Sequence, residues 1–496
     1  MISPRCNGPD AFIPGRDTTV NRAANENRQP GQKFGASVAT SVIGVTLAAA
    51  VAAPSLDRGG FTTGGQNLLL TLAAIALVET VLFMPGTLSE SIRAPVAPVL
   101  LLLGVLAIVS AAWTIGPAGA AAHWGLVIVA YGVIAVCGYV FASHAGLWPI
   151  AIGIALLAAL EAVLGLGSAA LHERPWAELI GGSWRPGGTF EYSAALGLLQ
   201  VCTLPVALRA ASSASPRVTY VGALALVLVG ATLGCADSRT DLGLAAVTLI
   251  FLGTFGDRRQ LPPRVALAST GLLAVAIVAG ALLLGRHTQA NANGGGIGRV
   301  LGTAIACFAL AMVWPALRAL TFRLELRRAA VLTVVAIVGG GAIWLAIGYG
   351  STLVSTGNGL DHGRISYWTA AVDAWRHRPI LGSGASTFAK ASARYQASGD
   401  RTLFAHNLPL ELAAELGVLG FLTGLWLYAA TARTLLRTIS APNAWLLAPT
   451  VGCFLLANLV DWPWHLVGMG AFWAAAAGGL GACSPSSDRS RAGAPR

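Results

Sequence analysis

The chain has 496 residues, of which 55% are hydrophobic and only 11% are charged. A soluble globular protein carries about 25% charged residues, so this composition excludes that class. The formal net charge is +11, but Arg and Lys gather in the cytoplasmic loops of membrane proteins, where they orient the helices. We therefore expect no nucleic-acid partner.

The two ends of the chain are polar. Residues 1–33 are rich in Arg, Asn and Pro and lack an apolar core, which indicates a disordered cytoplasmic tail rather than a signal peptide. Residues 483–496 are predicted to form a second cytoplasmic tail. The seven cysteines are scattered without paired spacing, so neither a disulfide framework nor a zinc knuckle is predicted.

Between these tails, apolar runs of about 17–25 residues have the length that crosses a bilayer as a helix. Their hydrophobicity is continuous rather than alternating, which favours helices over a barrel. The predicted fold is all-α, a polytopic transmembrane bundle of about fourteen spans. The predicted spans are 34–54, 66–84, 95–115, 123–142, 147–169, 191–210, 217–235, 239–255, 264–285, 299–317, 329–348, 408–432, 443–460 and 464–482.

The distribution of positive charge gives this bundle an orientation. With a cytoplasmic N-terminus, 20 of the 32 Lys and Arg residues fall on the inner side. Six of the other 12 lie in a single long loop, where the charge rule is weak. We therefore place both termini in the cytoplasm. The bundle then divides into about eleven spans (34–348), an extracytoplasmic loop (349–407) and three last spans (408–482).

The long loop is predicted to contain short helices, because structureless loops of this size are uncommon and usually functional. Residues 363–378 have helical spacing, with Tyr367, Ala371 and Trp375 on one stripe. Pro379 and the glycines of LGSG end this helix. A second amphipathic piece follows at 387–396.

Several arginines lie on the predicted outer side, against the usual bias. Arg185 lies in GGSWRPGGTF, Arg239 in CADSRTD and Arg364 in the loop, each in a Gly- or Ser-containing turn that opens a helix. A guanidinium binds phosphate oxygens bidentately and keeps its charge. The alternative is that an outer arginine extends to lipid phosphate or pairs with a nearby acid. We favour that alternative for four other outer arginines, Arg286, Arg299, Arg376 and Arg378.

His406 is a candidate general base, because histidine titrates near neutrality. The alternative is an interfacial histidine that packs on an aromatic ring. A zinc site from His362, His377 and His406 is a further alternative, but the spacing matches no metal pattern. We therefore predict no metal and no cofactor.

The residues after His406 resemble a helix start, with Asn407 as the cap and Pro409 in the first turn. Glu411 and Glu415 share one face of this helix, and we expect outer arginines as their partners. Gly417 and Gly420 would allow another helix to approach closely. Glu79 and Glu161, inside other spans, are expected to form structural hydrogen bonds. Asp461 and His465 bracket the last outer turn.

Two stretches, GRISYWTAAVDAWRHRPILGSGASTF and AHNLPLELAAELGVLGFL, resemble the signature region of the bacterial O-antigen ligase and polymerase superfamily. Upstream, RPGGTF and SRT are similar to two other arginine-bearing elements of that superfamily. The sequence departs from the pattern at Tyr192, where an amide is expected, and at Thr240, where Gly or Ala is preferred.

This resemblance implies a metal-independent, GT-C-like glycosyl transfer at the outer face of the cytoplasmic membrane. The donor would be a glycan linked to undecaprenyl diphosphate, within a lipid bilayer, and the acceptor a glycan, lipid or protein. We assign Arg239, Arg364 and Arg185 to the leaving diphosphate and His406 to proton removal from the acceptor hydroxyl. We expect the remaining candidates to bind substrate: Trp368, Asn407, Glu411, Glu415 and Asp461.

Two alternatives stay open. The enzyme could be a polymerase or a ligase, and nothing in one sequence separates them. A small-solute transporter is the rival class, but transporters place their polar site near the bilayer midplane, often at internal repeats. Here the polar residues gather at one face, and the sequence has no convincing repeat.

Overall fold

The computed structural model describes residues 30–92, 94–180, 183–283, 296–322, 363–396 and 401–483. Almost all regular structure in these ranges is helical, which confirms the predicted polytopic helical membrane fold. The N-terminal helices are α2 (Pro30–Leu56), η1 (Arg58–Gly60), α3 (Thr63–Phe83), α4 (Pro85–Ile92), α5 (Val96–Val109), η2 (Ser110–Ala112), α6 (Ala118–Ala145) and α7 (Trp148–Leu171).

A two-stranded hairpin follows α7, formed by β1 (Ala177–Ile180) and β2 (Ser183–Pro186). The sequence was not expected to contain strands here. The middle of the chain then consists of η3 (Gly188–Phe190), α8 (Ser193–Ala211), α9 (Pro216–Ala236), α10 (Arg239–Phe255), α11 (Pro263–Leu283), α12 (Ile297–Met312) and α13 (Trp314–Phe322). The C-terminal part consists of α15 (Arg364–His377), α16 (Phe388–Ser392), α17 (Leu408–Thr438), η4 (Ala444–Leu446), α18 (Ala448–Ala457), η5 (Pro463–His465) and α19 (Val467–Gly481).

Eight described helices are long and apolar enough to cross a membrane, or nine if the bent pair α4 and α5 counts as one span. Three shorter apolar helices lie within α11, η4–α18 and α19. Each predicted span coincides with a described helix except 329–348, which lies outside the described residues. The count of fourteen therefore stays a prediction.

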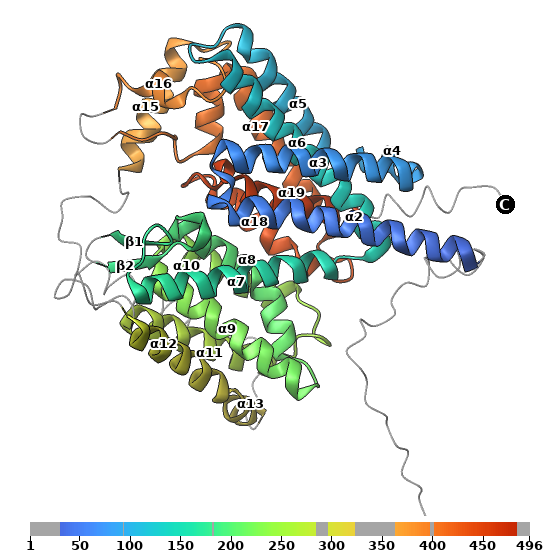
Figure 1. Ribbon diagram of the computed structural model, residues 1–496, viewed down its shortest axis with the longest axis vertical. Coiled ribbons are helices and arrows are strands. Elements are labelled where there is room, and N and C mark those ends of the chain that lie inside the picture. The colour runs from blue at the N-terminus through green and yellow to red at the C-terminus, as the bar shows by residue number, and fades with distance from the viewer. Residues whose placement is uncertain are drawn as a thin grey trace, which may run out of the picture.

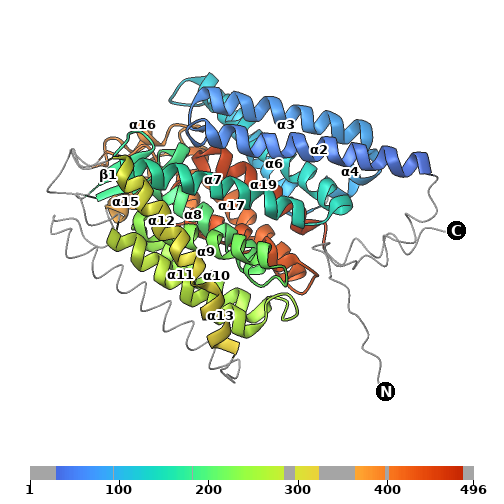
Figure 2. The ribbon, with the colours of Figure 1, turned by 60° about the horizontal axis from the view of Figure 1, so that its bottom comes forward.

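The helices form a bundle with a buried, largely apolar centre and an apolar outer surface. Every residue of α19 is buried, whereas only 22% of the apolar window of α3 and 17% of that of the span Ile297–Ala319, formed by α12 and α13, are buried within the chain. In Figure 2, α2 and α3 lie side by side along one edge, and α11, α12 and α13 lie along the opposite edge. Such exposed apolar helices are suited to contact with lipid.

The centre of the bundle relies on small residues. A Cβ atom added to Gly138 of α6 would lie 2.6 Å from the Ala475 carbonyl oxygen. One added to Gly478 of α19 would lie within 2.0 Å of the Ala135 carbonyl oxygen. The two backbones therefore pack directly against each other, as small residues permit in membrane helices.

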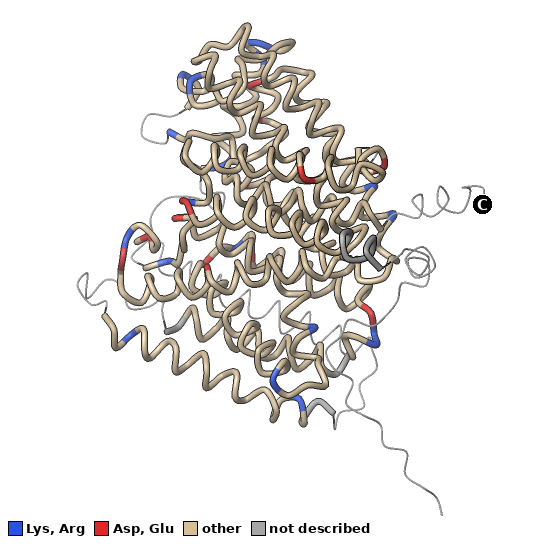
Figure 3. Tube along the Cα trace, turned by 45° about the vertical axis from the view of Figure 1, so that its right-hand side comes forward, with Lys and Arg blue, Asp and Glu red and all other residues tan. Residues whose placement is uncertain are grey.

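One end of the bundle carries the irregular structure. The hairpin β1–β2 and helices α15 and α16 lie at this end, opposite α4 and the first turn of α2 (Figure 1). In Figure 3 most charged positions lie near the ends of the helices, with few between them. We call the end that carries α15 and α16 the loop end.

At the loop end, the predicted helix 363–378 is confirmed as α15, which ends before Pro379. Gly382 and Gly384 follow with positive φ values of 69° and 94°, a conformation that glycine adopts readily. The second predicted piece, 387–396, is helical only over Phe388–Ser392.

α17 is broken at Gly417, which has φ 66° and ψ −155°. A Cβ atom there would lie 2.1 Å from the Ile380 carbonyl oxygen. The break leaves the carbonyl groups of Ala414 and Glu415 to accept hydrogen bonds from the backbone N–H groups of Ser383 and Gly384. The expectation that Gly417 admits another helix was thus wrong, because a loop packs there instead.

Candidate functional site

Two of the side chains predicted to act together, Arg364 and His406, meet at Asp461, in the turn between α18 and η5. Its Oδ1 and Oδ2 share the hydroxyl proton of Tyr192, whose oxygen lies 2.7 and 2.9 Å from them. Arg364 Nη2 lies 3.8 Å from Oδ2, and His406 Nε2 lies 4.0 Å from Oδ1. We call these four residues the Asp461 cluster. Asp461 is only 5% exposed, so its charge is compensated by these neighbours.

Arg364 is the first residue of α15, after Gly363, whose φ of 80° turns the chain into the helix. Its side chain is 23% exposed, yet its Nε is buried and has no hydrogen-bond partner within the described ranges. A buried N–H group without a partner is rare. Arg364 thus keeps donor capacity that an anion could use.

His406 presents an unprotonated nitrogen toward Asp461. Its Nδ1 lies 3.1 Å from the carbonyl oxygen of Phe404, which can only accept, so Nδ1 carries the proton and Nε2 the lone pair. Burial lowers the pKa of His406, and the charge of Asp461 acts in the opposite direction. A neutral imidazole in this setting can accept a proton from a hydroxyl group.

The backbone around His406 is tightly held. His406 itself has a positive φ of 53°, which is unusual for a residue other than glycine. Trp368 donates a hydrogen bond from Nε1 to the His406 carbonyl oxygen at 3.3 Å, and the Tyr367 ring packs against the imidazole. Trp368 therefore fixes His406 in this structure.

Asn407 caps α17, as predicted. Its Oδ1 accepts from the backbone N–H of Leu410 at 3.0 Å, and its Nδ2 donates to the Leu459 carbonyl oxygen at 2.9 Å. The second bond ties the start of α17 to the turn that carries Asp461. His406 and Asp461 are thus positioned by a shared set of contacts.

Glu411 and Glu415 have other partners than those expected. Glu411 contacts His465 Nε2 at 2.5 Å and accepts from the backbone N–H of Ala405 at 2.9 Å. Glu415 accepts three backbone N–H groups, those of Ser386, Thr387 and Phe388, at 2.7–2.9 Å. The predicted arginine partners are therefore wrong for the described part of the chain, and both carboxylates hold the loop in place.

A column of aromatic rings backs the cluster. Tyr192 stacks on Trp462 with 4.7 Å between ring centroids, and Trp462 stacks on Phe404 at 5.0 Å. Phe404 stacks on His465 at 3.9 Å, and His465 on Trp124 at 4.8 Å. Because Tyr192 and Phe404 are neighbours of the reactive groups, the column limits the movement of both Asp461 and His406.

The two upstream arginines, Arg185 and Arg239, do not belong to the Asp461 cluster. Arg185, on β2, donates from Nη2 to Asp237 Oδ2 at 2.9 Å, and its Nε is buried without a hydrogen-bond partner in the described residues. Arg239 is the first residue of α10, after the N-cap Ser238. Asp237 thereby connects the two predicted arginine elements. Neither arginine forms an ion pair with Asp461 in the described part of the chain.

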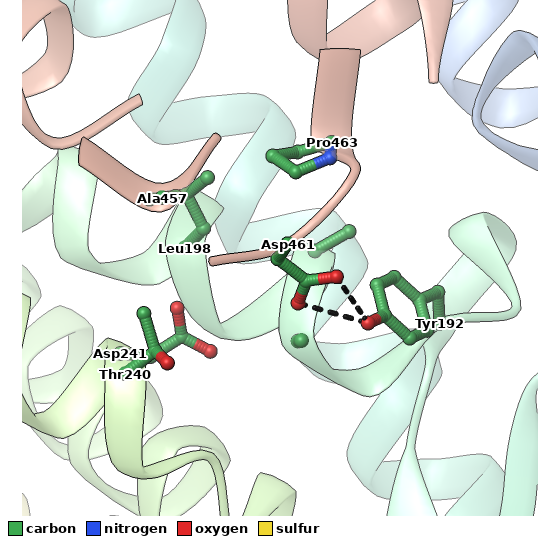
Figure 4. Close-up of a pocket in the computed structure, with 9 residues that line it drawn as sticks. Tyr192, Leu198, Thr240, Asp241, Ala457, Asp461 and Pro463 are labelled. Carbon is green, nitrogen blue, oxygen red and sulfur yellow. Dashed lines mark hydrogen bonds between the residues drawn. The ribbon is translucent and has the colours of Figure 1, made fainter. Parts of the chain in front are cut away.

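A small pocket adjoins the Asp461 cluster (Figure 4). Its lining includes Tyr192 from the start of α8, Thr240 and Asp241 from the start of α10, and Asp461 and Pro463 from the last turn. Figure 4 shows the carboxylates of Asp241 and Asp461 on two sides of this space. The elements that line it meet at the loop end.

Sequence reasoning missed Tyr192 and Asp241 as members of this site. Tyr192 was visible only as a departure from a family pattern, and Asp241 carried no signal of its own. Glu79 and Glu161 form the structural hydrogen bonds expected of them, with Thr46 and Thr189 respectively.

The described residues contain no group of three or more His, Cys, Asp or Glu side chains that could hold a metal ion. His362, which the zinc alternative requires, lies outside them.

Comparison with known proteins identifies one part of the chain. Residues 297–425 match the family described as O-antigen ligase. The matched segment contains Arg364, Trp368, His406, Asn407 and both glutamates of α17. Asp461 and the two upstream arginines lie outside it. No curated protein matched the chain.

Proposed function

Because the chain carries a domain of the O-antigen ligase family, we propose that it transfers glycan from an undecaprenyl-diphosphate carrier at the outer face of the cytoplasmic membrane. The observation that carries this proposal is the meeting of Arg364, His406 and Asp461 at the loop end. The first two lie within the matched segment, and the third comes from a distant turn.

His406 acts as the general base in this proposal. Its Nε2 takes the proton of the acceptor hydroxyl as the hydroxyl oxygen attacks the anomeric carbon of the donor sugar. The bond from that carbon to the diphosphate oxygen breaks, and its electron pair leaves with the diphosphate. This single displacement inverts the anomeric carbon. Asp461, 4.0 Å from Nε2, stabilises the imidazolium that forms.

Arg364 binds the leaving diphosphate. Its unpartnered Nε supports this role, because charge develops on the diphosphate as the glycosyl bond breaks. We assign Arg239 and Arg185 to the same group. The 2.9 Å bond from Arg185 to Asp237 leaves its Nε as the donor for this purpose. The fixed fork of an arginine suits two phosphate oxygens at once.

The remaining residues that were predicted to bind substrate instead position other residues of the site. Asn407, Glu411, Glu415 and Trp368 all bond to backbone or side chains that position His406 or the loop. We therefore propose that they act through His406 and Arg364 rather than by touching glycan. The lipid carrier would enter between the apolar helices, and the acceptor would be a glycan, lipid or protein.

A small-solute transporter is not favoured. Transporters hold their substrate near the bilayer midplane, whereas the Asp461 cluster is built from helix ends and turns at the loop end. Of the glutamates inside spans, Glu161 accepts hydrogen bonds from Thr189 at both carboxylate oxygens, and Glu79 accepts one from Thr46 at Oε1.

The test is His406→Ala, assayed with purified protein and undecaprenyl-diphosphate-linked glycan. We expect transfer to fall about 10²- to 10⁴-fold, the usual contribution of a positioned base. Arg364→Lys should also reduce transfer, although it keeps the charge, since it loses the bidentate contact. His377→Ala is the matched control, because His377 is exposed at the end of α15.

Both variants must first be shown to insert and fold as the wild type does. Wild-type rates in His406→Ala would refute the base assignment. Transport of a small solute into liposomes without lipid-linked glycan would support the rival class.

A further inference from the structure

One of the two carboxylates that line the small pocket beside the Asp461 cluster has an oxygen without a partner. Asp241 is 2% exposed and lines the pocket, and its Oδ2 has no hydrogen-bond partner among the described residues. Its backbone N–H is bound to Ser238, and the unpartnered atom is Oδ2 of the side chain. Burying a polar oxygen without a donor is unfavourable. A ligand that donates a hydrogen bond to Oδ2 would explain why an aspartate lies at this buried position.

The surroundings of Asp241 make space for its carboxylate. A Cβ atom on Gly197 of α8 would lie 2.4 Å from Asp241 Oδ2. Only a glycine at position 197 therefore allows the carboxylate to occupy this position. The pocket itself has room for about one water molecule, or one hydroxyl group of similar size.

The lining decides what kind of group fits. Across the pocket, the two oxygens of Asp461 share the single hydroxyl proton of Tyr192, and Oδ1 also accepts from the Trp462 backbone N–H. Asp241 is thus the acceptor that remains. Two carboxylates on one small space disfavour an anion such as a phosphate. A single neutral hydroxyl group satisfies the free oxygen and fits the available room.

We propose that Asp241 binds one hydroxyl group of a sugar in the lipid-linked glycan. This inference rests on the proposed function and adds a sugar-recognition subsite to it. An ionised Asp241 accepts the hydrogen bond from the hydroxyl, and a protonated one donates to the hydroxyl oxygen. Asp461 connects the subsite with His406 and Arg364, so the hydroxyl is bound on the same sugar that the reaction uses or on its neighbour.

The experiment compares two ligands on the full-length purified protein. The first is undecaprenyl-diphosphate-linked glycan extracted from cells that make this protein, and the second is undecaprenyl diphosphate without glycan. Asp241→Ala should bind the first about 10- to 100-fold more weakly, the effect of one hydrogen bond to a charged group. It should bind the second like the wild type, because the proposed subsite binds a sugar hydroxyl group and not the diphosphate. Arg364→Ala should weaken both.

Asp241→Asn keeps the shape of the side chain and one oxygen acceptor, so it should lose less affinity for the glycan-linked carrier than Asp241→Ala. It replaces the alanine variant in the binding assay if Asp241→Ala does not fold. Asp373→Asn, which removes a partly exposed carboxylate paired with Arg376 on α15, is the matched control. Unchanged binding of the glycan-linked carrier by both Asp241 variants would overturn the subsite. So would a stabilisation of the wild type by Na⁺ or Mg²⁺ that Asp241→Asn abolishes, since a cation would then be the occupant.

The subsite and the proposed function fail in different ways. Weaker glycan binding by Asp241→Ala without any transfer by the wild type supports the subsite and refutes the transferase. Glycan transfer by the wild type, together with unchanged glycan binding by Asp241→Ala, supports the transferase and refutes the subsite. A wild type that binds neither carrier contradicts both.

Discussion

In the centre of the bundle, α6 and α19 touch backbone to backbone at Gly138 and Gly478, whereas at the loop end carboxylates hold backbone N–H groups. Glu415 alone accepts three of them. The centre therefore depends on shape, with no charge to titrate in that contact. The loop end depends on hydrogen bonds from backbone N–H groups to side-chain carboxyl groups, which require a specific geometry. The reactive groups lie in the second region, where a change of charge alters geometry.

The largest expected effect is that of Glu415→Ala. It leaves the buried N–H groups of Thr387 and Phe388 without an acceptor, at about 1–3 kcal/mol each, and also the partly buried N–H of Ser386. We expect a loss of folding stability of about 3 kcal/mol or more, measured by thermal unfolding in detergent, with transfer lost as well. Glu415→Gln keeps an oxygen acceptor and should lose less. Equal stability of Glu415→Ala and wild type would contradict the role of this carboxylate.

Gly478→Ala tests the other region. The added Cβ would clash with the Ala135 carbonyl oxygen, so α6 and α19 must separate. We expect a loss of about 1–3 kcal/mol, as for overpacked cores, and no change in the pH dependence of any activity. Gly153→Ala is the control, since a Cβ at Gly153 of α7 meets nothing within 4 Å. A Gly478→Ala protein as stable as this control would refute the direct backbone contact.

The smallest expected effect is a change in the pH dependence of glycan transfer, which should be seen for the loop end and not for the centre of the bundle. His406 must be neutral to act as a base, and burial lowers its pKa below the ordinary value of 6.5. Transfer should therefore persist as the pH falls to about 6.5 and decline only below it. Asp461 raises the pKa of His406, so Asp461→Asn should move this decline to still lower pH. The measurement is the pH–rate profile of the residual activity, and a shift to higher pH would contradict the assignment.

The local features of the candidate site were predictable from the sequence because their signals are local. The start of α17 follows from Asn407 and Pro409, which satisfy the free N–H groups of a first turn. The end of α15 follows from Pro379. The role of Gly417 was misread, because a pair of glycines indicates close approach without saying what approaches.

The partners of the two glutamates in α17 were mispredicted for a related reason. Arginine is a visible partner for a carboxylate in a sequence, whereas a backbone N–H group exists at nearly every residue and leaves no signal. Only the fold brings residues 386–388 back to Glu415. The same holds for Glu411, whose partner His465 lies 54 positions away.

By itself, the sequence determined the class of the protein and the region to inspect. Long continuous apolar runs require helices in lipid, because no solvent there can pair with a free backbone, and the order of Arg364, His406 and Glu415 indicated the family. The tertiary structure alone decided which groups meet. Tyr192 reaches Asp461 across 269 positions of chain, and Asp241 is left with a free oxygen at the same place. Such contacts depend on how helix ends pack together, and no local pattern encodes that packing.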